Sequence, residues 1–138
     1  MNKLTTLMTC ALLACGGAWA ADPVRHEPVE LVQGAPLKKL SGKIKGYQTV
    51  EYRIAVPAGG ALSLKLRSAN QSSNFNVGVE GADEALFVGS RDGAHFEATA
   101  PANAVYKVGI YLMRNAARRS EQASYVLEAS VNAPATAR

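Results

Sequence analysis

The sequence contains little cysteine and little histidine, and this excludes most common kinds of catalytic and metal site. It has two cysteines and two histidines among 138 residues. Both cysteines, Cys10 and Cys15, lie in the first 20 residues, which have the pattern of an export signal. The exported protein is therefore expected to have no disulfide, no thiol nucleophile and no cysteine-based metal site. Its apolar core must hold the fold without covalent cross-links.

The first 20 residues are predicted to be a Sec signal peptide. Met1-Asn2-Lys3 is basic, residues 4–14 are mostly apolar, and Ala18-Trp19-Ala20 fits the small-x-small cleavage rule. The apolar run is too short to span a bilayer as a mature helix, so no membrane insertion is expected after cleavage. Leu12-Leu13-Ala14-Cys15 resembles a lipobox, so a lipid anchor at Cys15 is the alternative. The first reading places the protein in the periplasm, and the second anchors it in the envelope.

The sequence offers no clear nucleic-acid or cofactor site. The formal net charge is +4 at pH 7, and loss of Lys3 with the signal lowers it by one. This charge is too small to indicate nucleic acid, and the basic residues are not interleaved with aromatic ones. Gly59-Gly60 lies in a turn between two strands rather than before a helix, so it does not make a phosphate-binding loop. No cofactor is expected.

Residues suited to catalysis or metal binding do not converge in the sequence. Ser90 and Asp92 lie near His95, but Ser90-Arg91-Asp92-Gly93 is typical of a hairpin turn rather than of a catalytic triad. Asp83, Glu84 and Asp92 could offer oxygen ligands at one end of the fold. Solvated turn acids explain them more simply. We therefore predict that the protein is not an enzyme and holds no metal.

Alternating apolar residues predict an all-β fold. Apolar and polar side chains alternate with period two in successive segments, and turn residues recur about every ten positions. No segment of ten or more residues has a helical stripe, although Ala116–Ala123 could make a helical turn. We expect a single antiparallel β-sandwich of about seven to nine strands. The strands with inward apolar residues are Tyr52–Val56, Leu62–Leu66, Phe75–Val79, Leu86–Val88, Phe96–Ala98, Tyr106–Leu112 and Tyr125–Val131.

The expected domain boundaries follow from these patterns. Residues 21–36 read as a polar lead-in with one short strand around Val29–Val32. The sandwich covers residues 37–132, and residues 133–138 form a frayed C-terminus.

Three arginines lie within six residues between two predicted strands. These are Arg114, Arg118 and Arg119, with Asn115 beside the first. No acidic residue follows until Glu121, so no partner for the cluster is evident inside the loop. Guanidinium groups bind carboxylates in a bidentate manner, so the cluster favours a negatively charged partner. A basic loop that only aids solubility is the alternative.

A second segment, Ser41-Gly42-Lys43-Ile44-Lys45-Gly46-Tyr47, has two glycines that bracket two lysines. Glycine permits backbone angles that other residues avoid, so the segment predicts a bulged strand or an exposed loop. Tyr47 then either anchors a binding surface or packs against the edge of the sandwich. Spacing alone favours neither reading.

These two segments, together with Tyr52, the strand to Ser68, the stretch Pro101–Tyr106 and Tyr125, resemble the periplasmic inhibitors of g-type lysozyme of Gram-negative bacteria. The resemblance covers about Leu40–Val131. The chain is more distantly similar to the pre-peptidase C-terminal β-sandwich domains of secreted bacterial enzymes.

The resemblance implies a sandwich whose loops enter the substrate cleft of g-type lysozyme and so protect peptidoglycan. Arg114, Asn115 and Arg118 would lie on one such loop, and Lys45 and Tyr47 on another. Arg119 matches the family pattern less tightly and would only steer the partner. A lysozyme cleft carries a catalytic acid, which a guanidinium group can engage. The alternative is a non-catalytic envelope module that binds glycan or another envelope protein.

Overall fold

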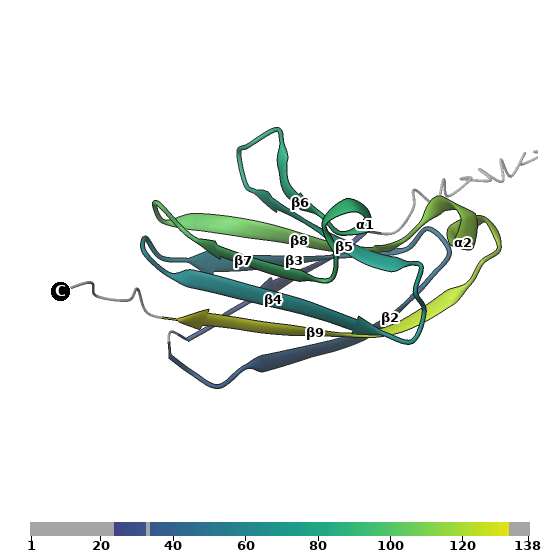
Figure 1. Cartoon of the computed structure of the whole chain (residues 1–138), viewed down its shortest axis with the longest axis horizontal. Coiled ribbons are helices and arrows are strands. Elements are labelled where there is room, and N and C mark those ends of the chain that lie inside the picture. Colours follow the sequence, from purple (N-terminus) through teal and green to yellow (C-terminus); the bar gives the residue numbers. More distant parts are fainter. Residues whose placement is uncertain (1–23, 33, 133–138) are drawn as a thin grey trace, which may run out of the picture.

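The computed structural model describes residues 24–32 and 34–132 and shows a sandwich of two sheets (Figure 1). The five-stranded sheet has the order β1-β3-β8-β5-β6, and the four-stranded sheet has the order β2-β9-β4-β7. The all-β prediction is confirmed, with nine strands. Their bounds are β1 Val24–Val29, β2 Lys38–Lys45, β3 Thr49–Val56, β4 Ala61–Ser68, β5 Ser73–Val79, β6 Ala85–Val88, β7 His95–Thr99, β8 Ala104–Leu112 and β9 Gln122–Asn132. Two short helices are α1, Gly89–Asp92, and α2, Arg114–Arg118.

The core lies between the sheets and consists of alternate side chains from each strand. The inward positions of β3 and β4 read Val50, Tyr52, Ile54 and Val56, then Leu62, Leu64 and Leu66, and all are buried. Three aromatic rings close one side of the core: Phe87 stacks on Phe75 at 4.9 Å and meets Phe96 edge-on at 5.5 Å. Burial of this apolar surface stabilises the fold without any cross-link.

The inward face of β6 differs from the predicted one. We expected Leu86 and Val88 to point inward, but Phe87 is buried and Leu86 is 52% exposed. β6 has four residues and no polar one, so period two does not fix its face. The aromatic cluster decides the register, because Phe87 buries a larger apolar side chain than Leu86 would and its ring packs on Phe75 and Phe96. A register shift between Val77 and Gly78 accompanies this pairing.

Three further expectations about local structure were wrong. The short strand lies at Val24–Val29 rather than around Val29–Val32, and β1 pairs in parallel with β3 instead of antiparallel. Only Val29 of β1 is buried, so this edge strand has no apolar stripe that a sequence pattern could reveal. The predicted turn Ser90–Gly93 lies largely in α1, Gly89–Asp92.

The remaining boundary predictions lie outside the described residues. These are the signal peptide at 1–20, the alternative anchor at Cys15 and the frayed segment 133–138. Within the described residues, no helix is long and apolar enough to cross a membrane.

Candidate functional site

Helix α2 lies at one end of the sandwich, where it joins β8 to β9 (Figure 1). Its two arginines, Arg114 and Arg118, are both exposed. Arg114 and Arg118 are four residues apart, so their side chains leave the helix on the same side. Ala116 and Ala117, on the other side, are 0% and 2% exposed. The small alanines let this short helix sit directly on the core, and they direct both guanidinium groups outward.

The β2–β3 turn lies against α2. Gly46 has a φ of +60°, and its N–H donates to the Glu121 carbonyl at 3.0 Å. A Cβ at Gly46 would lie 3.7 Å from the Ala117 carbonyl oxygen. Gly46 therefore fixes its neighbours Lys45 and Tyr47 beside the helix. Tyr47 is 50% exposed, so the structure favours the presented tyrosine over one packed against the sandwich edge.

Arg119 differs from the other two arginines because it has a partner inside the loop. Its Nε donates to Glu121 Oε2 at 2.7 Å, and Asn70 Nδ2 donates to Glu121 Oε1 at 3.2 Å. Arg114 and Arg118 form no ion pair with any residue in 24–32 or 34–132. Thus Arg119 helps to hold the loop, while Arg114 and Arg118 remain available to a partner. Asn115, beside Arg114, is exposed as well.

Glu121 joins three segments at this end of the molecule. Its carboxylate binds Arg119 and the β4–β5 loop, its carbonyl binds the β2–β3 turn, and its N–H donates to the Ala116 carbonyl at 3.1 Å. The hydrogen bond from Arg119, and then that from Asn70, lower the pKa of the Glu121 carboxyl below its ordinary range. The ionised carboxylate therefore stabilises the arrangement of the three loops.

We expect the effect of Glu121→Gln on stability to depend on pH. A carboxyl group whose folded-state pKa is lowered stabilises the fold above its unfolded pKa of about 4.3, and this contribution is lost as the pH falls through the lowered value. Wild type should therefore be more stable than Glu121→Gln at neutral pH, and the gap should close in acid. Denaturant unfolding over a pH series measures this, with Asp83→Asn as a control for losing one negative charge. A gap of equal size at neutral and acidic pH would contradict the role of the ionised carboxylate.

The sequence did not predict a role for Asn70, which lies in the β4–β5 loop and supports the site through hydrogen bonds. Its Nδ2 also donates to the Gln122 carbonyl at 3.0 Å, and its Oδ1 accepts from the Ser72 N–H at 2.9 Å. Ser72 in turn accepts from the Met113 N–H at 2.9 Å, which ties the start of α2 to this loop. The polar stretch Ser68–Asn74 signals a turn, but its contact with a segment about 50 residues away is not visible in the sequence.

Two tyrosines join the sheets close to the start of β9. The hydroxyl groups of Tyr52 and Tyr125 lie 2.7 Å apart and are buried, and burial raises the pKa of both phenols. Tyr125 crosses above Gly42, its partner on β2, where a Cβ would lie 2.4 Å from the Tyr125 hydroxyl oxygen. The two glycines of Ser41–Tyr47 thus have structural roles. Gly42 leaves room for the ring of Tyr125, and Gly46 lets the β2–β3 turn lie against α2.

The weaker enzyme and metal candidates do not form sites. His95 Nε2 lies 3.2 Å from Glu97 Oε1 and 3.5 Å from the Ser63 hydroxyl oxygen. The partners of His95 are therefore Glu97 and Ser63, and not Ser90. The Asp92 carboxylate binds Arg91 and accepts from the Val88 N–H, and these bonds lower its pKa to about 2. In the part of the chain that the structure describes, no three metal-ligating side chains gather.

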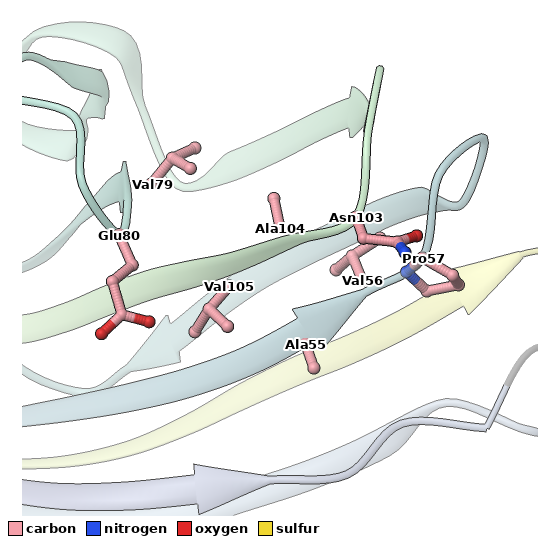
Figure 2. Close-up of a pocket in the computed structure, with 8 residues that line it drawn as sticks. All are labelled: Ala55, Val56, Pro57, Val79, Glu80, Asn103, Ala104 and Val105. Carbon is pink, nitrogen blue, oxygen red and sulfur yellow. The ribbon is translucent and has the colours of Figure 1, made fainter.

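A hollow of about 560 Å³ lies where β3 and β5 end and β8 begins, away from α2 (Figure 2). Glu80 lies at one end of it, and Pro57 and Asn103 lie at the other. Both polar groups already have partners: Asn103 Oδ1 accepts from the Ala58 N–H at 2.8 Å, and Glu80 Oε1 accepts from Arg53 at 3.4 Å. None of the predicted site residues lines this hollow.

Comparison with solved structures identifies the family. The crystal structure of Aeromonas hydrophila PliG, a periplasmic inhibitor of g-type lysozyme, is 33% identical to this chain, with a TM-score of 0.70. The match covers 80% of this chain and 99% of that one. The chain belongs to the family of periplasmic inhibitors of g-type lysozyme. The resemblance inferred from the sequence is therefore confirmed.

More distant structures share the fold. Salmonella Typhimurium PliG is 21% identical with a TM-score of 0.58, over 78% of this chain and 97% of that one. The pre-peptidase C-terminal domain of a Bacillus anthracis collagenase is 18% identical with a TM-score of 0.55, over 79% of this chain and 96% of that one. No protein-family model and no curated protein matches the sequence.

Proposed function

We propose that this protein is a non-catalytic periplasmic inhibitor of g-type lysozyme that protects peptidoglycan. The observation that carries the proposal is the 33% identity to the Aeromonas hydrophila inhibitor over nearly all of that chain. The partner is a protein, and no cofactor takes part.

The inhibitor acts through the end of the sandwich that carries α2. Arg114 and Arg118 leave one side of the helix without intramolecular ion pairs among the described residues, so they can engage carboxylates of a lysozyme cleft. Asn115 and Tyr47 lie beside them and offer the amide and aromatic contacts that a sugar ring would make. Lys45 adds positive charge at the rim, which speeds the encounter with an acidic partner, while Arg119 acts mainly by holding the loop through its pair with Glu121.

Rigid support makes this end suited to filling a cleft. Hydrogen bonds through Glu121 and Asn70 join the β2–β3 turn, the β4–β5 loop and α2. The backbone that carries the exposed side chains is therefore held in place. A surface already held in its binding conformation loses less entropy when it binds.

The test is lysis of peptidoglycan by purified g-type, c-type and i-type lysozymes with increasing amounts of this protein. We expect the g-type enzyme to lose nearly all activity at micromolar inhibitor, with the other two classes less affected. Heat-denatured protein is the control. If none of the three enzymes is slowed, the proposal fails, and binding to peptidoglycan without lysozyme would then favour the envelope-module alternative.

A further inference from the structure

The outward face of the four-stranded sheet carries a concentration of positive charge, of which the proposed inhibition uses only Lys45. The outward side chains of β2 and β4 include five exposed cations, which alternate with the inward Ile44, Leu64 and Leu66. We call this surface the basic face; its cations are Lys39, Lys43, Lys45, Lys65 and Arg67.

Acidic residues neutralise only part of the basic face. Glu128 on β9 accepts from Arg67 Nε at 3.1 Å, and Glu97 on β7 pairs with His95. The register places Glu128 between Lys39 and Lys65 across three neighbouring strands. The outward face of the other sheet differs, since Arg53 there contacts two carboxylates, Glu51 and Glu80.

Protection of a sheet edge does not account for this charge. Lysines on an edge strand such as β2 discourage pairing with other chains. However, Lys65 lies on β4 at a position where β9 and β7 pair with it on both sides, and Arg67 follows two residues later on the same strand. The basic face therefore extends over the interior of the sheet.

The chemistry of the basic face suits phosphate groups better than sugar rings. No described aromatic side chain points outward from this sheet, because Phe96 and Tyr125 both face the core. A shallow hollow of about 450 Å³ lies next to Arg67, and the serines Ser41, Ser68 and Ser124 line it. Tyr125 also lines it, but only 2% of this residue is exposed, so its ring offers no platform. Hydroxyl groups and flexible cations on a broad sheet suit a plane of phosphate groups, whereas glycan sites depend on aromatic platforms.

We propose that the basic face adsorbs to the surface of an anionic phospholipid bilayer without insertion. The face presents its cations side by side, so several can meet headgroup phosphates at once. In this orientation α2 stays at the end of the sandwich, beside the membrane plane, and remains open to a partner. This proposal is independent of the proposed inhibition.

Sedimentation with vesicles tests the proposal, using vesicles with about one third phosphatidylglycerol and vesicles of phosphatidylcholine alone. We expect binding to the anionic vesicles only, and release at high salt. The triple variant Lys39→Gln, Lys43→Gln, Lys65→Gln should lower the partition coefficient about 100-fold, since each basic residue near an anionic surface contributes about fivefold. Unchanged melting would show that the triple variant is folded.

A matched triple variant, Arg53→Gln, Arg91→Gln, Lys107→Gln, removes the same charge from the other half of the molecule and should bind vesicles nearly as wild type does. Equal losses in both triple variants would overturn the proposal, because net charge alone would then control binding. Absence of vesicle binding, or lysine-dependent binding to purified peptidoglycan alone, would also overturn it. The lysine variant should still inhibit lysozyme in solution, so this proposal and the proposed function can fail separately.

Discussion

Replacing Arg114 and Arg118 together by alanine should raise the inhibition constant for g-type lysozyme by roughly three orders of magnitude. Truncating one member of a buried interfacial charge pair costs about 2–5 kcal/mol, and about 1.4 kcal/mol corresponds to tenfold. Neither arginine forms an ion pair among the described residues, and the alanines beneath them carry the packing of α2. The melting temperature should therefore change little. Titration of lysozyme activity against each variant measures the effect.

Two further variants separate shape from charge. Arg114→Lys with Arg118→Lys keeps the charge but removes the planar fork, so it should recover only part of the inhibition. Arg91→Ala removes an exposed arginine from α1, where it pairs with Asp92, and should inhibit as wild type does. If the double alanine variant inhibits like Arg91→Ala, these arginines have no part in the mechanism.

The sequence predicted the sandwich correctly because a long strand contains several repeats of the alternation between apolar and polar residues. β4 alternates Leu62, Leu64 and Leu66 with small or charged residues, and burial follows this alternation. The pattern failed where a strand was short and wholly apolar, as at Leu86 and Phe87. It also failed at β1, which pairs in parallel with β3 while burying little. In both places, contacts with distant segments decide the structure.

The site was predictable in part for the same reason. The spacing of Arg114 and Arg118 is local, so the sequence alone could suggest a shared surface. The separate role of Arg119 depends on Glu121 and on Asn70, about 50 residues earlier in the chain, and only the fold brings these groups together. The glycines near Tyr47 were noticed, but their tasks depend on Tyr125 and Ala117, which lie on other elements.

Gly42→Ala should strongly destabilise the fold, with a loss of about 3–5 kcal/mol in the free energy of unfolding. The added Cβ would lie 2.4 Å from the Tyr125 hydroxyl oxygen and 2.6 Å from its Cζ, so the ring must move. Overpacking costs about 1–3 kcal/mol, and each buried hydroxyl left without a partner costs about 1–3 kcal/mol. Moving the ring also breaks the bond to Tyr52 that joins the two sheets.

Gly109→Ala is the matched control, since this glycine also lies within a strand and its added Cβ would meet only Thr49 Cγ2, at 4.0 Å. Alanine there should be neutral or slightly stabilising, because glycine costs about 0.5–1 kcal/mol in a strand. Denaturant unfolding compares the two variants. Combining Gly42→Ala with Tyr125→Leu should recover part of the loss, because the smaller side chain frees the space that the new methyl group needs. Equal stability of the Gly42 and Gly109 variants would mean that Tyr125 does not lie over Gly42, and the link between the sheets beneath α2 would need another explanation.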